Sequence, residues 1–152
     1  MSALPPPFPL PGPAGRSAVR LSGALLFVLL ACESSTTSPR LAVRFQMAFH
    51  HFGPSEQFVV EARDPGLVAR ARAQLALPVE ERTHFVSGPL ARGNGGHNAG
   101  WSWHLVPDEW ELTEASIELC DSLPSMLETD LDDWLTRVGR LCPWDSYVAA
   151  EL

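Results

Sequence analysis

A short apolar run near the N-terminus, Leu21 to Ala31, constrains this chain more than any other feature, and it ends at Cys32. Eleven residues of helix reach about 16 Å, roughly half the hydrocarbon thickness of a bilayer, so the run is too short for a membrane span. Arg16 and Arg20 precede it, as in a secretory signal peptide, and residues 1–15 hold six of the 14 prolines. We therefore predict that residues 1–31, a Pro-rich preface plus an apolar core, are a signal peptide that takes no part in the mature fold.

The cysteine that ends this run indicates a lipid anchor. Residues 29–32, Leu-Leu-Ala-Cys, resemble a bacterial lipobox, in which the cysteine receives a diacylglycerol before cleavage and becomes the mature N-terminus. Residues 33–40 are mostly polar, which is typical of a flexible tether. The prediction is a protein attached to the membrane through Cys32, in the bacterial cell envelope, facing the periplasm or the exterior. The alternative is an ordinary secretory signal, because Ala31 also suits a simple signal peptidase.

The charge balance argues against polyanionic partners. The chain has 11 basic residues, all arginine, against 18 acidic ones, and two of the arginines lie in the predicted signal peptide. Nucleic acids and anionic membrane surfaces require a positive footprint, so neither is expected to bind the mature chain. Apolar residues make up 45% and charged residues 19%, a composition that can fold and bury a core.

Hydrophobic periodicity predicts one α+β domain over residues 41–152. Asp64 followed by Pro65 is typical of a helix start, and this helix should end near Pro78. A second helix is expected over residues 124–138, with Gly139 as its C-cap. Alternating or apolar segments predict strands over 41–49, 57–62, 84–90, 101–105, 110–119 with a break near Glu114, and from Leu141 onward. This order predicts a two-layer sandwich of a mainly antiparallel sheet, with five to six strands, and two helices.

The remaining two cysteines are predicted to form a disulfide. With Cys32 lipidated, Cys120 and Cys142 are an even pair in an oxidising compartment, where disulfides persist. They flank the expected second helix, about 21 Å long, and a bridge requires Cα atoms within about 7 Å of each other. The chain must therefore fold back along the helix on both sides. The alternative is two buried free thiols.

The stretch from residue 93 to residue 104 is the predicted binding site. Its first part, Gly93 to Gly100, is a long glycine-rich loop, and ordering it costs conformational entropy that a shorter connection would avoid. Binding residues concentrate on loops carried by a rigid sheet, and tryptophan is favoured at binding hot spots. We therefore predict a binding role for Asn98, Trp101, Trp103 and His104. The alternative is that both indoles fill the core, with His104 hydrogen-bonded on the other face.

No catalytic pattern is present in the sequence. His97 and His104, joined by His50 or His51, could ligate zinc, but no H-E-x-x-H or Cys-His spacing occurs, and there is no G-x-S-x-G. The acidic residues 130–133 lack the glycine and the terminal glutamate of a calcium loop. We predict no enzyme, no metal and no cofactor, but a non-catalytic binding or inhibitory module whose partner is an unknown envelope or extracellular protein. The alternatives are a structural envelope lipoprotein and a metal-assisted hydrolase using His97 and His104.

Five short motifs resemble those of a known family. They are F-V-V-E-A-R-D-P at 58–65, H-F-V-S-G at 84–88, N-A-G-W-S-W-H at 98–104, I-E-L-C-D at 117–121 and C-P-W at 142–144. Together they are similar to a small secreted bacterial domain family often labelled calmodulin-binding protein. The resemblance implies extracellular residence and a non-enzymatic role, and it supplies no catalytic residue.

Overall fold

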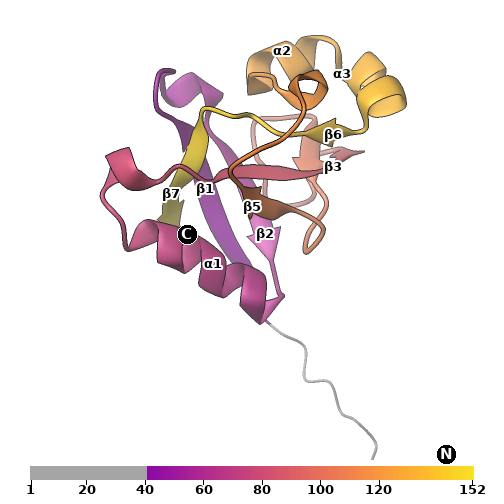
Figure 1. The fold of residues 1–152 in the computed structure, drawn as a ribbon. Helices are drawn as coiled ribbons and strands as arrows, with labels where there is room; N and C mark the ends of the chain where they lie inside the picture. Colours follow the sequence, from indigo (N-terminus) through magenta and orange to yellow (C-terminus); the bar gives the residue numbers. More distant parts are fainter. Residues whose placement is uncertain (1–40) are drawn as a thin grey trace, which may run out of the picture. The chain divides into compact units, whose positions relative to one another are not determined.

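The strands of residues 41–152, the part of the chain that the computed structural model describes, divide into two antiparallel sheets (Figure 1). The predicted α+β sandwich with antiparallel strands is confirmed, and its strands form two sheets where one was expected. The first has the order β2-β1-β7: β1 is Val43–Phe49, β2 is Phe58–Ala62 and β7 is Ser146–Glu151. In the second, three strands pair with the central strand β3: β3 is Phe85–Arg92, β4 is Trp103–Leu105, β5 is Glu111–Thr113 and β6 is Arg140–Leu141. The predicted signal peptide, Cys32 and the tether lie outside the described residues.

The middle of β1 follows the predicted alternation. Phe45 and Met47 of β1 are fully buried, whereas Arg44 is exposed and Gln46 is half-buried. β1 and β2 form the expected antiparallel pair, with Phe45 opposite Val60 and Met47 opposite Phe58. β7 pairs with the other side of β1, and their register shifts between Gln46 and Met47. The sheet therefore places one apolar face toward the core.

The helix α1, Pro65–Leu75, begins as the sequence predicts and ends slightly before the expected Pro78. The side chain of Asp64 accepts a hydrogen bond from the backbone N–H of Leu67, at 2.8 Å, and Pro65 occupies the first helical position. Leu67, Val68 and Ala71 are buried against the core, and the helix packs against β7 and β2. Within the described residues, no helix has both the length and the apolar character that crossing a membrane requires.

The second sheet requires a glycine in its central strand. A Cβ at Gly88 would lie 2.6 Å from the Cβ of Trp110 and 2.9 Å from its Cα, so only glycine fits at position 88 against Trp110. Two predicted strands are shorter than expected, because β4 begins only at Trp103 and β5 ends at Thr113. Residues 114–117 are irregular, and a single 3₁₀ turn follows at Glu118–Cys120. The expected strand over 110–119 is therefore wrong after the predicted break near Glu114.

The second predicted helix is not continuous. It consists of α2, Pro124–Thr129, then α3, Leu131–Asp133, and a π-helical turn, Trp134–Val138, with an interruption at Asp130 (φ −116°, ψ 32°). Aspartate side chains compete with the helix for backbone hydrogen bonds, and three of residues 130–133 are aspartate, which explains the break. Gly139 ends the segment in the left-handed conformation, φ 69°, as expected.

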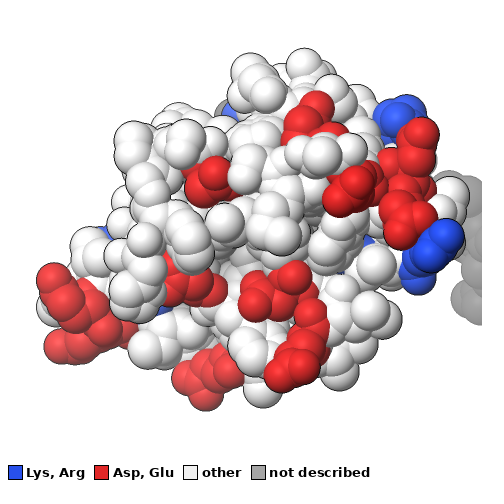
Figure 2. Space-filling view, turned by 90° about the horizontal axis from the view of Figure 1, so that it is seen from above, with Lys and Arg blue, Asp and Glu red and all other residues white. Residues whose placement is uncertain are grey.

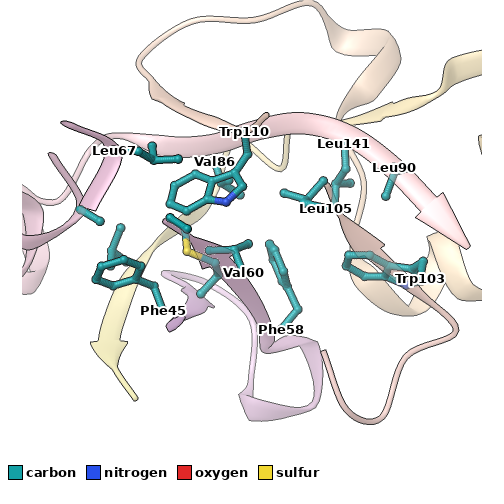
Figure 3. Packing of buried hydrophobic residues seen from close by; sticks show 14 of the residues in the cluster. Phe45, Phe58, Val60, Leu67, Val86, Leu90, Trp103, Leu105, Trp110 and Leu141 are labelled. Atoms are coloured by element: carbon teal, nitrogen blue, oxygen red, sulfur yellow. The ribbon is translucent and has the colours of Figure 1, made fainter. Parts of the chain in front are cut away.

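The two sheets share one hydrophobic core, and Figure 3 shows their side chains meeting. Phe58 of β2 packs on Trp103 of β4, with ring centroids 5.5 Å apart. Phe45 of β1 packs edge-to-face on Trp110, at 6.5 Å. These aromatic pairs link the first sheet to the second.

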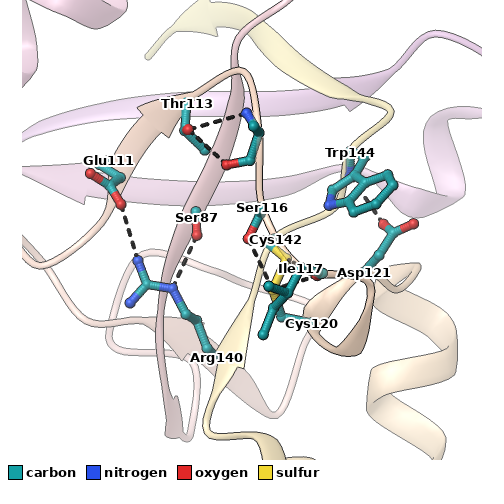
Figure 4. Close-up of a disulfide and its surroundings, with 11 residues drawn as sticks. Ser87, Glu111, Thr113, Ser116, Ile117, Cys120, Asp121, Arg140, Cys142 and Trp144 are labelled. Carbon is teal, nitrogen blue, oxygen red and sulfur yellow. Dashed lines mark hydrogen bonds and ion pairs between the residues drawn. A yellow bond between two sulfur atoms is a disulfide. The ribbon is translucent and has the colours of Figure 1, made fainter.

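Cys120 and Cys142 form the predicted disulfide, with their Cα atoms 5.2 Å apart (Figure 4). Both residues are buried beside Phe85, and the backbone N–H of Cys142 donates to the carbonyl of Cys120 at 2.8 Å. The bridge joins the 3₁₀ turn before α2 to the chain after β6. It therefore closes the helical segment onto the second sheet.

Candidate functional site

The predicted binding stretch lies against the free edge of β2. β2 is an edge strand, and side chains instead of another strand bind its outward backbone groups. These contacts occur at alternate residues, the period of a strand. Trp101 Nε1 donates to the Gln57 carbonyl (2.9 Å), Val59 N to Asn98 Oδ1 (2.9 Å), Trp110 Nε1 to the Glu61 carbonyl (2.8 Å), and Arg63 N to Asp108 Oδ1 (2.5 Å).

This arrangement corrects part of the binding prediction. Asn98 and Trp103 have no exposed surface, so neither is available to contact a partner. Asn98 also donates from Nδ2 to the Trp103 carbonyl, at 2.9 Å, and so ties the loop to β4. Trp101 is half-buried and packs on Trp103, with ring centroids 5.8 Å apart. These residues hold the two sheets together, as the core alternative predicts.

The two histidines of the stretch lie close together, and each directs Nδ1 at a backbone carbonyl. His97 Nδ1 lies 3.1 Å from the Gly95 carbonyl, and His104 Nδ1 lies 2.7 Å from the Gly93 carbonyl. Because a carbonyl can only accept, each Nδ1 carries the hydrogen. The ring centroids are 5.4 Å apart, and a Cβ at Gly95 would lie 2.6 Å from the His104 ring. Burial lowers the pKa of His97 below its ordinary value of 6.5, so this ring is neutral near pH 7 and its Nε2 is an acceptor.

Neutral imidazoles with a free Nε2 are suitable zinc ligands, but a zinc site in a protein takes three or four protein ligands. Among residues 41–152, no group of three or more histidine, cysteine, aspartate or glutamate side chains is placed to hold a metal. His50 and His51 have other contacts: the His50 ring stacks on Tyr147, and His51 Nδ1 pairs with Asp145 at 2.6 Å. The structure therefore does not bring either of them to the pair of His97 and His104 as a third ligand.

The exposed side of the stretch borders an acidic depression of about 520 Å³. It lies beside the break between α2 and α3, and Ser102 N donates to Glu128 Oε2 across it at 2.9 Å. Arg92 pairs with Asp132. Figure 2 looks down on this end of the molecule, where acidic side chains outnumber basic ones. Such a surface repels polyanions.

Trp144 is an exposed aromatic residue that is not among the predicted binding residues. Its relative exposure is 41%, whereas the other four tryptophans lie in the core or pack against it. Trp144 borders two open depressions, of about 540 Å³ and 320 Å³, which share Trp144 and Thr83. We call this region the Trp144 surface. The larger depression is lined by His50, His51, Glu80, Arg82, Thr83, Trp144 and Ser146, and the smaller by Thr83, Phe85, Glu114, Ala115, Ser116 and Trp144.

The backbone on both sides of Trp144 is held in place. Its own N–H donates to Asp121 Oδ1 at 3.0 Å, and the disulfide lies two residues before it (Figure 4). Asp145, the next residue, accepts from the backbone N–H of His51 at 2.9 Å and also pairs with its ring. The sequence signal that could have identified Trp144 is the C-P-W motif, which places an indole beside a disulfide and outside any apolar periodicity.

The model of one protein family, the BP-74 N-terminal domain, matches residues 42–152. The chain belongs to this family. The match extends from the residue before β1 to the end of the chain, so every strand and helix described above lies within this family's domain. No curated protein and no solved structure is significantly similar to the chain.

Proposed function

We propose that this protein is a lipid-anchored, non-catalytic binding module of the bacterial cell envelope. In this proposal Cys32 attaches the mature chain to the membrane, and the BP-74 N-terminal domain presents the Trp144 surface to an envelope or extracellular component. The L-L-A-C sequence and the polar residues after it support the anchor. The disulfide between Cys120 and Cys142 agrees with an oxidising compartment, and the resemblance to a secreted family supports the same location.

The placement of Trp144 is the observation that carries the binding role. Single exposed apolar residues are common on protein surfaces, so exposure alone is weak evidence. Trp144, however, stands between two depressions, and its backbone is fixed by a disulfide and by Asp121. A side chain on a backbone that is already ordered loses little conformational entropy on binding, and tryptophan is among the residues that contribute most to binding energy.

The test compares Trp144→Ala with Met126→Ala in the full chain. Met126 is 59% exposed on α2 and does not line the Trp144 surface, so it serves as the matched control. Chemical cross-linking in intact cells should recover envelope components with the wild type and with Met126→Ala, and much less with Trp144→Ala. Equal recovery from all three would contradict the binding role and favour the structural envelope lipoprotein.

The anchor has a separate test. Changing Cys32 to serine should release the protein from the membrane fraction or leave an uncleaved precursor, because serine cannot take the thioether-linked lipid. Fractionation of cells and gel migration measure both results. A Cys32→Ser protein that fractionates and migrates like the wild type would show that the anchor proposal is wrong.

A further inference from the structure

The Trp144 surface also indicates the chemistry of a ligand, an inference that rests on the binding role proposed above. Its two depressions, of about 540 Å³ and 320 Å³, have the size of small-ligand sites. They adjoin at Thr83 and Trp144, so the indole stands between them. We propose that this surface binds a chain of neutral or amino sugars, with one sugar ring stacked on Trp144 and the neighbouring rings in the two depressions.

The groups around Trp144 match the two kinds of surface that a sugar ring presents. A pyranose has faces of C–H groups and a rim of hydroxyls, so it requires a flat aromatic side chain with hydrogen-bonding groups beside it. The indole of Trp144 supplies the flat aromatic surface. The hydrogen-bonding groups are hydroxyls, imidazoles and carboxylates: the larger depression has His50, His51, Glu80 and Thr83, and the smaller has Glu114 and Ser116.

A buried hydroxyl in the larger depression supports a ligand that can form hydrogen bonds. Ser146 is only 2% exposed, and its Oγ has no hydrogen-bond partner among the described residues. A buried polar atom without a partner costs free energy. A ligand hydroxyl that forms a hydrogen bond with Ser146 Oγ removes this cost, so the bond stabilises the complex more than a hydrogen bond to solvent would. Purely apolar ligands would leave this atom unsatisfied.

The charges of the lining residues oppose an anionic ligand. Glu80 lines the larger depression and Glu114 the smaller, and both carboxylates are exposed, with Glu114 Oε1 3.4 Å from His84 Nε2. The one lining arginine, Arg82, donates its hydrogen bonds to the carbonyls of Leu75, Leu77 and Val148, at 3.2, 3.0 and 2.9 Å. Nucleic acids and uronic-acid polymers also stack on tryptophan, but they require free cations. The ammonium group of an amino sugar, by contrast, is attracted by carboxylates and by the face of an indole.

The experiment uses the full processed chain purified in detergent and three soluble probes of equal length. These are cellotetraose, which is neutral, the tetramer of glucosamine, which is cationic, and tetragalacturonate, which is anionic. Calorimetric titration and tryptophan fluorescence should show saturable binding of cellotetraose or the glucosamine tetramer, and weaker or no binding of tetragalacturonate. Sedimentation with envelope polysaccharide from the producing cell, compared with cellulose and chitosan particles, distinguishes an envelope source of the sugar from an external one.

Three variants connect the binding to Trp144. Trp144→Ala should weaken binding at least about tenfold, as expected for an aromatic hot spot. Trp144→Phe should retain part of the affinity, because phenylalanine keeps an aromatic face, whereas Met126→Ala should bind like the wild type. Melting temperatures of all variants are measured alongside, and Trp144→Phe keeps the test valid if Trp144→Ala is unstable.

Absence of saturable binding to both cellotetraose and the glucosamine tetramer would overturn the inference, as would a preference for tetragalacturonate. Unchanged affinity in Trp144→Ala would also overturn it. These failures are distinct from a failure of the proposed function. If cross-linking to envelope components depends on Trp144 but no sugar binds, the binding role stands and the saccharide inference is wrong.

Discussion

Replacing Asn98 by alanine should destabilise the domain strongly, because this side chain joins the free edge of β2 to the second sheet. Asn98 is fully buried and forms two hydrogen bonds, accepting from Val59 N and donating to the Trp103 carbonyl, both at 2.9 Å. The alanine variant leaves both backbone groups buried without partners. Each such group costs about 1–3 kcal/mol, so the expected loss of unfolding free energy is about 2–6 kcal/mol.

Urea unfolding followed by circular dichroism measures this loss. For a domain of this size, each kcal/mol lowers the melting temperature by roughly 4 °C, so the decrease should exceed about 8 °C. Amide hydrogen exchange adds a local readout, because the Val59 N–H should lose protection in Asn98→Ala. Asn94→Ala is the matched control: Asn94 is exposed in the same loop, and its Oδ1 accepts one hydrogen bond, from Gly96 N at 2.9 Å.

Asn94→Ala should cost less than about 1 kcal/mol, since the freed N–H can bond to water. The reasoning is refuted if Asn98→Ala is as stable as Asn94→Ala and Val59 keeps its protection. In that case the N-A-G-W-S-W-H stretch does not close the sheet edge, and its interpretation as a binding loop regains support.

Other measurements test further parts of the structure. Trp110→Phe should lower the unfolding free energy by about 1–3 kcal/mol more than Trp103→Phe does. The reason is that Trp110 Nε1 donates to a β2 carbonyl, whereas Trp103 Nε1 is buried without a partner among the described residues. Urea unfolding gives both values, and equal losses would contradict the hydrogen-bond assignment. Replacing Cys120 and Cys142 together by alanine should lower the unfolding free energy by about 3 kcal/mol, because the bridge closes a loop with a sequence separation of 22 residues and so restricts the unfolded chain. An unchanged urea midpoint would argue against the bridge. Burial lowers the pKa of His97 below 6.5 in the folded chain. As the pH falls below about 6.5, the unfolded chain therefore binds more protons than the folded chain, and the unfolding free energy decreases. His97→Gln should therefore show a flatter decline of melting temperature between about pH 7 and pH 5, and parallel curves for the two proteins would show that His97 does not contribute.

Features that depend on local interactions could be predicted from the sequence alone. The alternation around Phe45 and Met47 predicts β1, and the Asp64–Pro65 pair predicts the start of α1, because both depend on neighbouring residues. Gly139 is likewise an αL cap that the local backbone requires. An even count of two cysteines, given the predicted lipidation of Cys32, also predicts the pairing of Cys120 with Cys142.

Only the tertiary structure decided which face of each element is covered, and by what. The alternation of Trp101 and Trp103 fits an exposed binding face as well as a buried one, because a period of two does not state what packs on either side. The neighbour is β2, some 40 residues earlier in the chain, whose edge binds Asn98 and Trp101. The division into two sheets has the same cause, since strand pairing joins residues far apart in sequence.

The Trp144 surface depends even more on distant contacts. Its lining residues come from the segments 50–51, 80–85, 114–116 and 144–146, which no local pattern connects. The sequence determined the elements that depend on neighbouring residues, such as β1 and the start of α1, because backbone geometry, capping and hydrophobic periodicity are local. The depressions on either side of the indole were decided by long-range packing and by the disulfide, because only the folded chain brings those four segments together.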